Sequence, residues 1–379
     1  MQKYDKTPSN GIVEHYSSYM NLGEGYIVDL ILATRLSLES NNPLWLCIQG
    51  ASSSGKTDIL RMLKNDSDCH FLYDLTGVSL FSGANGAGGG YIPREVGDEG
   101  ILVFPDFTTT LTKGKYTLDS IMSQLRVTYD GDANRITGMD TQRREPWNGK
   151  VGVLLAVTDE IERFKKKASG LGERFLYFRH TIPEFDTLGF KSKTPNKFPK
   201  EEYDELLDIG RKLDPLDWTD EMRLRVNNAA KWVSMARSSV VRDSRTKEVE
   251  LVNSPEEPYR LVEQFHVLIN SLYRVHMDII DRTWSIFNEI VWGCVPFDRF
   301  DLLISILKEM EKTDPNIKGI RQSELTDILS YGKSRLSYLV EDMCLQGIIT
   351  KEDGNIFLTE KFETLWDGWT DKELVFSKY

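Results

Sequence analysis

The sequence predicts an α/β protein in which a parallel sheet with a P-loop is followed by a helical lid and a C-terminal winged-helix domain. Three observations lead to this fold class. A glycine-bounded loop sequence ends a strand-like apolar run, further apolar runs alternate with helical stretches to about residue 198, and residues 320–359 follow the order helix, turn, helix, β-hairpin. Alternating strands and helices form mostly parallel sheets with helices on both faces. The expected domains are residues 1–198, 199–311 and 312–379.

Composition narrows the class of protein. The 379 residues are 40% hydrophobic, enough for a sizeable core in two or three domains. No apolar run approaches the ~18 residues of a membrane span, and the N-terminus lacks the apolar core of a signal peptide. Four cysteines without metal or disulfide spacing fit a reducing compartment. We therefore expect a cytoplasmic protein without a membrane partner, whose net charge of −11 limits any DNA contact to local basic patches.

The strongest motif is the P-loop GASSSGKT at residues 50–57, which follows a helix expected at 25–38 and the strand-like run 44–49. Its glycines let backbone N–H groups curl round a phosphate, Lys56 reaches the β- and γ-phosphates, and the Thr57 hydroxyl can hold Mg²⁺. A helix expected from residue 58 directs its positive dipole end at the same phosphates. The sequence therefore predicts ATP and Mg²⁺ as cofactors. The loop residues that we expect to bind ATP are Gly50, Ser52, Ser53, Ser54, Gly55, Lys56 and Thr57.

A second strand is expected at residues 69–75, and the glycine-rich segment 83–90 is interpreted as a connector in preference to a functional flap. The strand-like run 100–107 contains Asp106, where a P-loop ATPase carries the aspartate of its Mg²⁺ shell. The next position, commonly a water-activating glutamate in this enzyme class, is Phe107. Hydrolysis therefore requires another acid, or is slow, or is absent.

A helix is expected at residues 117–130, and the turn-rich segment that follows it is locally basic. Arg135, Arg143, Arg144 and Lys150 supply this charge. Two interpretations of the segment are equally weighted. It is either a hairpin that places Arg143 and Arg144 on DNA phosphates, or a solvated loop.

The fourth and fifth strands are expected at residues 151–157 and 174–179. Thr158 follows the fourth strand, where many such ATPases sense the γ-phosphate. Asp159 and Glu160 come next and are candidates for the missing water-activating acid.

The order of these elements resembles that of the AAA+ ATPases. Over about residues 25–281 the chain looks most like minichromosome-maintenance-type and mobile-element helicases, and two stretches are similar to phage and integrative-element ATPases. This resemblance is specific at the P-loop and weaker elsewhere. It implies that Arg174 acts as an arginine finger on a neighbouring subunit's ATP, with Arg179 in reserve. The alternative for Arg174 is an ion pair with Glu173 or another nearby acid.

Helical periodicity dominates residues 199–281, as in an AAA+ lid. The resemblance implies that an arginine at the start of a lid helix reaches the γ-phosphate. Arg260 matches this position and Arg237 is the alternative; both could equally be solvated helix arginines. In the winged-helix pattern, the second helix would present Lys333, Ser334, Arg335 and Ser337 to DNA. Many winged helices bind protein instead.

Two functions compete. The first is a DNA-acting AAA+ ATPase, helicase-like, from a mobile element or phage, that works as a homo-oligomer for which a hexameric ring is one arrangement. Its expected catalytic residues are Lys56, Asp106, Thr158, Arg174 and Arg260, its metal ligands are Thr57 and Asp106, and its DNA contacts are Arg143, Arg144, Lys333 and Arg335. The second is an ATP-binding switch or loader that hydrolyses weakly and acts on a protein partner.

Overall fold

The computed structural model describes residues 9–81, 90–133, 147–168, 174–182, 197–278, 281–312 and 319–370. The chain divides into two compact units. The first unit comprises residues Met1–Ile161, Arg174–Leu216 and His266–Ile286, and the second comprises the remainder. Each unit is considered by itself. The predicted domain boundaries at residues 198 and 311 remain predictions.

The first unit is built on a five-stranded parallel sheet with the order β2-β3-β6-β1-β7. Its strands are β1 (Trp45–Gln49), β2 (Cys69–Phe71), β3 (Glu99–Phe104), β6 (Lys150–Val157) and β7 (Leu176–Arg179). In the register of the sheet, Leu46 pairs with Leu154 on one side and with Leu176 on the other. The strand that precedes the P-loop is therefore an inner strand, and the predicted α/β class with a parallel sheet is confirmed.

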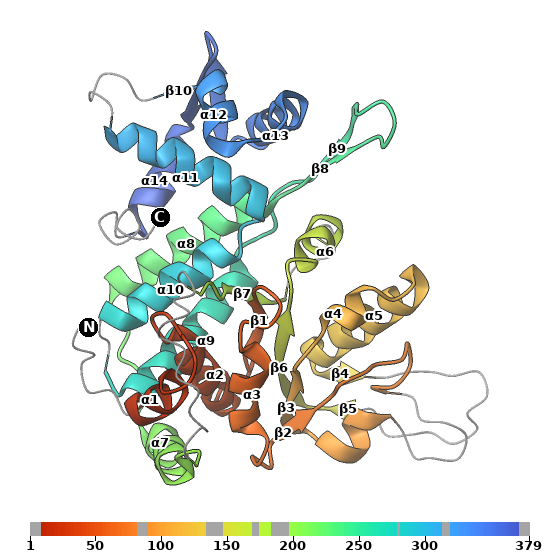
Figure 1. Cartoon of the computed structure of the whole chain (residues 1–379), viewed down its shortest axis with the longest axis vertical. Coiled ribbons are helices and arrows are strands. Elements are labelled where there is room, and N and C mark those ends of the chain that lie inside the picture. Colours follow the sequence, from red (N-terminus) through yellow and green to blue (C-terminus); the bar gives the residue numbers. More distant parts are fainter. Residues whose placement is uncertain are drawn as a thin grey trace. The chain divides into compact units, whose positions relative to one another are not determined.

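Helices cover the sheet. Those of the first unit are α1 (Asn10–Ser17), α2 (Tyr26–Leu36), α3 (Lys56–Leu60), α4 (Thr108–Leu111), α5 (Lys115–Asp130) and α7 (Lys200–Lys212). Figure 1 shows α2 and α5 on opposite sides of the strands, and α2 contacts β1 and β6 whereas α5 contacts β6. Because helices cover both faces of the sheet, β1 is buried along its whole length. This burial explains why its sequence is a nearly continuous apolar run.

Buried charges fix the helices of the first unit. Asp29 of α2 is fully buried, accepts a 2.8 Å hydrogen bond from the Ser9 hydroxyl and a 2.7 Å bond from Nε of Arg282, and lies 3.6 Å from Nε2 of His276. Burial by itself raises the pKa of Asp29, but the neighbouring His276 ring, the charge of Arg282 and the hydrogen bond from Ser9 outweigh it, so the pKa lies below its ordinary value. A buried carboxylate needs such partners to remain ionised.

A short antiparallel pair, β4 (Asp132–Ala133) with β5 (Trp147–Asn148), follows α5. This pair flanks the basic segment, for which a hairpin and a solvated loop both remain predictions. Arg135, Arg143 and Arg144 lie outside the described residues, as does nearly all of the glycine-rich segment at 83–90.

The second unit is largely helical. Within it lie α6 (Ile161–Ala168), which begins at the boundary, α8 (Asp220–Arg237), α11 (Phe297–Lys312), α12 (Gln322–Leu329), α13 (Lys333–Leu345) and α14 (Glu360–Asp367). Helices α9 (Tyr259–His276) and α10 (Asp281–Gly293) run from one unit into the other. An aromatic cluster forms the core of this unit, where Trp232 stacks on Phe362 with ring centroids 5.0 Å apart and lies 5.0 Å from Trp292.

Helices α12 and α13 are followed by a hairpin of β11 (Ile349–Glu352) and β12 (Asn355–Leu358), as expected, and β12 also pairs with β10 (Ile320–Arg321). The turn at Asp353 and Gly354 has φ of 49° and 83°, as an Asp-Gly hairpin turn requires.

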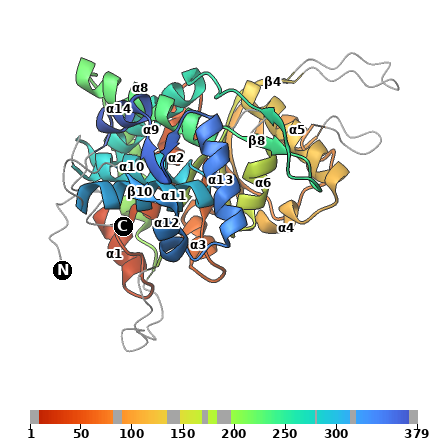
Figure 2. The ribbon, with the colours of Figure 1, turned by 90° about the horizontal axis from the view of Figure 1, so that it is seen from above.

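A further hairpin, β8 (Val240–Arg242) with β9 (Val249–Val252), was not predicted. Its Arg242 bonds Asp342 at 2.8 Å and Glu341 at 2.9 Å, which places the hairpin beside α13 in both views (Figures 1 and 2). Across the described ranges, no helix combines the length and apolar character needed to cross a membrane.

Candidate functional site

The candidate site lies at the carboxyl edge of the parallel sheet. Gly50 directly follows β1, Asp106 lies two residues after β3, Thr158 directly follows β6 and His180 directly follows β7. Because the strands are parallel, their following loops meet at one edge, where open α/β sheets bind ligands. The P-loop, the acid and the polar strand tip expected from sequence are therefore on the same edge.

The P-loop conformation explains its glycines. A Cβ at Gly50 would lie 2.7 Å from the carbonyl oxygen of His180, too close for any other residue. Gly55 has φ of 80°, in the left-handed region that favours glycine. Ser53 also has a positive φ, 61°, which costs a serine on the order of 1 kcal/mol and is a kind of strain that concentrates at functional sites.

The loop offers backbone donors. Two of them already have acceptors: the Gly50 N–H donates to Val157 O of the neighbouring strand β6 at 3.1 Å, and the Ser54 N–H donates to Ala51 O at 3.4 Å. For the N–H groups of Ser52, Gly55 and Lys56, the described parts of the chain supply no acceptor. A curved row of uncommitted N–H groups is an anion-binding geometry.

Lys56 is folded beneath the loop and is only 8% exposed. Its ammonium donates to Gly50 O at 2.8 Å, to Ala51 O at 2.6 Å and to the Ser54 hydroxyl at 3.0 Å. Burial lowers the pKa of Lys56, while the negative charges of Asp159 and Asp106 act in the opposite direction. The ammonium of Lys56 is therefore enclosed by the loop and is attracted by the negative charges of Asp159 and Asp106.

Thr57 and Asp106 approach each other across the edge. The Thr57 hydroxyl donates a 2.9 Å bond to the carbonyl of Pro105, the residue before Asp106. Asp106 is exposed, and its Oδ1 accepts the Thr108 N–H at 3.0 Å. Phe107 points the other way: it is 2% exposed and packs against Phe104 with ring centroids 5.4 Å apart. The position after Asp106 therefore belongs to the core and cannot present a side chain to a nucleotide.

Thr158 lies at the tip of β6 and joins the loop after β3. Its backbone N–H donates to the Thr108 hydroxyl at 3.0 Å, and the two hydroxyls are 3.4 Å apart. Asp106, Thr108 and Thr158 thus form one connected polar row at the edge of the sheet.

Asp159, the next residue, is exposed but anchored. Its Oδ1 accepts a 3.0 Å hydrogen bond from Nε2 of Gln49, which is itself only 2% exposed at the end of β1. This hydrogen bond joins Asp159, one of the two acids proposed to replace the missing glutamate, to the strand that leads into the P-loop. Glu160 beside it is exposed.

His180 was not singled out from sequence. It is 4% exposed, its backbone N–H donates to Gln49 O at 2.7 Å, and its Nε2 lies 3.1 Å from Ser54 O. Burial lowers the pKa of His180, the bond to Ser54 raises it, and the nearby charge of Lys56 lowers it further. A histidine directly after the last strand was a visible signal, but its contact with the P-loop depends on β7 lying beside β1.

Arg174 lies at the opposite edge of the sheet. It precedes β7 by two residues, and because Leu176 pairs with Leu46, Arg174 is level with the start of β1. Its side chain is 12% exposed, bonds Asp130 at 3.2 Å and lies over the Tyr129 ring at 5.4 Å. Arg174 thus lies at the edge opposite the P-loop of the same chain. Arg179, the reserve candidate, ends β7 opposite Gln49, at the carboxyl edge.

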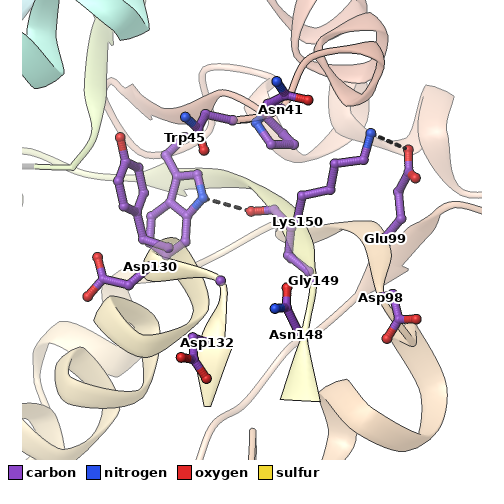
Figure 3. A pocket seen from close by; sticks show the side chains of 14 residues that line it. Asn41, Trp45, Asp98, Glu99, Asp130, Asp132, Asn148, Gly149 and Lys150 are labelled. Atoms are coloured by element: carbon purple, nitrogen blue, oxygen red, sulfur yellow. Dashed lines mark hydrogen bonds and ion pairs between the residues drawn. The ribbon is translucent and has the colours of Figure 1, made fainter. Parts of the chain in front are cut away.

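A pocket of about 490 Å³ lies at the amino edge of the sheet, beside Asp130, the residue that pairs with Arg174 (Figure 3). Trp45, Asp98, Glu99, Asp130, Asp132 and Lys150 are among its lining residues. Lys150 is engaged here, bonding Glu99 at 3.3 Å and the Leu38 carbonyl at 2.7 Å. Its ammonium is therefore bound within the fold, which weakens its expected part in a basic DNA-contacting segment.

The remaining predicted residues lie in the second unit. Arg260 is the second residue of α9, and Arg237 ends α8 in an ion pair with Glu256. Lys333 and Arg335 are exposed in the first turn of α13, where Arg335 lies 4.3 Å over the Tyr331 ring. Arg242 lies over Tyr338 one turn further along, so the hairpin β8–β9 occupies the later part of α13 and leaves its first turn accessible.

Comparisons of the sequence with models of known protein families and with curated proteins find no match. The five-stranded parallel sheet with flanking helices is compatible with a P-loop-like fold.

Proposed function

We propose that the protein is an ATP-binding, AAA+-type ATPase whose nucleotide lies at the carboxyl edge of the sheet. One observation carries the proposal: the N–H groups of Ser52, Gly55 and Lys56, for which the described residues supply no acceptor, lie in the loop that encloses the buried ammonium of Lys56. This loop is on the same edge of the sheet as Asp106 and Thr158. Backbone donors with one central cation are the chemistry that phosphate oxygens require.

The residues present fit ATP and Mg²⁺. The loop from Gly50 to Gly55 would hold the phosphates, and Lys56 would exchange its bonds with loop carbonyls for bonds with phosphate oxygens. The described residues contain no group of three or more His, Cys, Asp or Glu that could hold a metal alone. Thr57 and Asp106 would therefore hold Mg²⁺ together with phosphate oxygens, a shared arrangement that this ion favours. Bound Mg²⁺ would neutralise charge that develops on the phosphates during transfer.

Asp159 is the acid that we assign to water activation. In hydrolysis the water oxygen bonds the γ-phosphorus, the bond to the β-phosphate oxygen breaks, and the water proton passes to a base. Asp159 is exposed at this edge, is oriented by Gln49, and interacts electrostatically with Lys56. Thr158, joined to Thr108, would hold the γ-phosphate.

Arg174 is the proposed arginine finger of a composite site. Its place at the amino edge excludes its own P-loop, so its guanidinium could reach only the nucleotide of a neighbouring subunit. This geometry favours a homo-oligomer as the active form. Arg260 and Arg237 remain candidates for a lid arginine.

DNA is the proposed substrate. Two features support it: the order α12, α13, β11, β12 is that of a winged helix, and the accessible first turn of α13 carries Lys333 and Arg335. Arg143 and Arg144, in the basic segment between β4 and β5, would add further contacts with phosphates. The proposal thus extends to a helicase-like or remodelling factor.

Burial of Phe107 favours the second candidate, an ATP-dependent switch with weak turnover that acts on a protein partner. Steady-state ATP hydrolysis, measured alone and with single- or double-stranded DNA at low salt, separates the two. Turnover that DNA stimulates supports the motor. ATP binding with slow turnover and no DNA affinity supports the switch, and no ATP binding contradicts both.

A further inference from the structure

His180 touches both ends of the P-loop. At the entry, its backbone N–H bonds Gln49 O at 2.7 Å, and its carbonyl oxygen lies where a Cβ on Gly50 would come within 2.7 Å. At the exit, its ring Nε2 lies 3.1 Å from Ser54 O. His180, the residue directly after β7, therefore contacts both ends of the loop that follows β1.

The ring contact fixes the chemistry of the histidine. A backbone carbonyl oxygen can only accept, so Nε2 must carry the proton and donate it to Ser54 O. The Ser54 hydroxyl in turn accepts from the Lys56 ammonium at 3.0 Å. The histidine thus holds the backbone of the residue whose side chain holds the phosphate-reaching lysine.

We propose that His180 is a positioning residue that keeps the P-loop in its phosphate-binding shape, and this inference rests on the proposed nucleotide site. The loop contains two positive φ angles, at Ser53 and Gly55. For the N–H groups of Ser52, Gly55 and Lys56, the described residues supply no acceptor that would hold them in a curve. Its shape therefore depends on contacts from outside, and the bond to Ser54 O is one of them.

Loss of the bond between His180 and Ser54 should weaken the affinity for ATP more than it slows the hydrolysis step. A loop that populates other conformations binds in proportion to its competent fraction. The bound nucleotide and the transition state both require the ordered loop, so the change is one of uniform binding, which raises KM and leaves kcat nearly unchanged. A residue that only supports the fold would instead reduce the amount of active protein and leave KM unaltered.

The experiment compares four full-length variants with the wild type. His180→Leu removes the donor, whereas His180→Gln keeps an N–H donor at a similar reach. In His180→Asn the side chain keeps an amide but is too short to reach Ser54 O. This variant replaces His180→Leu in the comparison if the leucine variant does not fold. His70→Leu is the matched control, because His70 lies in β2 of the same sheet, away from the P-loop. The measurements are the Kd for Mg²⁺-ATP, the KM and kcat for hydrolysis, and the rate at which trypsin cuts the bond after Lys56, followed by mass spectrometry.

We expect His180→Leu to raise Kd and KM about tenfold, the effect of one buried carbonyl left unsatisfied, with kcat within about twofold. His180→Gln should restore most of the affinity, and His70→Leu should match the wild type. Cleavage after Lys56 should accelerate in His180→Leu alone among these three, because Lys56 is buried while the loop is ordered.

Equal affinity and equal cleavage in His180→Leu and wild type would overturn the inference, as would the same losses in His70→Leu. A wild-type protein that does not bind ATP would overturn the proposed function instead. The cleavage rates would then decide by themselves whether His180 holds the loop.

Discussion

Nε2 of Gln49 donates a 3.0 Å hydrogen bond to Oδ1 of Asp159 and so joins the ends of β1 and β6. Gln49 is buried and cannot move far, whereas Asp159 is exposed. The bond holds an accessible carboxylate in one orientation beside Lys56. An acid held in this way can take a proton from water without first being ordered, which is what general base catalysis requires.

Asp159→Asn should therefore lower turnover by at least about a hundredfold and leave ATP affinity within a few-fold of wild type. The asparagine oxygen can still accept from Gln49, so the local structure is preserved while the base is lost. The measurement is kcat with Kd for ATP in parallel. Glu160→Gln is the matched comparison, and the assignment is wrong if that variant loses turnover while Asp159→Asn retains it.

Arg174→Ala should reduce turnover by roughly 10³-fold or more, as loss of an arginine finger does, with ATP affinity nearly intact. The ion pair with Asp130 provides the control. Asp130→Asn removes the same pair but keeps the guanidinium, so its turnover should stay at or above the wild-type rate. If Arg174 serves only the fold, both variants should behave alike, with small effects on stability because Asp130 is largely exposed.

The buried carboxylate of Asp29 should make stability depend on pH. Its pKa is lowered in the folded state, so its contribution is complete above the ordinary value of 3.8 and is lost as pH falls through the lowered value. At neutral pH, Asp29→Asn should reduce the free energy of unfolding by about 3 kcal/mol, because Arg282 keeps a charge without its partner.

Urea unfolding at several pH values tests this expectation. The difference between wild type and Asp29→Asn should shrink below pH 3.8. Asp132→Asn, a change at an exposed carboxylate of the same unit, should have little effect at any pH. A difference that does not change with pH would mean that ionisation of Asp29 is not what stabilises the fold.

The periodic parts of the fold could be predicted from the sequence. The strand-like runs at 44–49 and 151–157 and the helix before Gly131 all appear, because a continuous apolar run or a helical stripe with a glycine stop reflects local burial. The aromatic core of the second unit could not be predicted in this way. Trp366 and Trp369 pack with Trp232, a contact between residues far apart in the chain that no local pattern encodes.

The candidate site shows the same division. The motif at residues 50–57 identified Lys56 as a candidate from sequence alone, because the spacing of a P-loop is local in the chain. The contacts of His180, the anchoring of Asp159 and the partner of Arg174 depend on strand order and register, which arise when the sheet assembles. Phe107 was noticed as a departure from an expected acid, and its burial against Phe104 gives the physical reason.

A calorimetric titration of Mg²⁺-ATP tests most directly whether phosphate binds over Lys56. The wild type should bind one ATP per chain, and Lys56→Ala should weaken binding by roughly tenfold to a hundredfold, since a charge-assisted bond to phosphate is lost. Lys64→Ala, a change at an exposed lysine just beyond the helical segment, should bind as the wild type does. A folded Lys56→Ala protein with unchanged affinity, or a wild type that does not bind, would contradict the account.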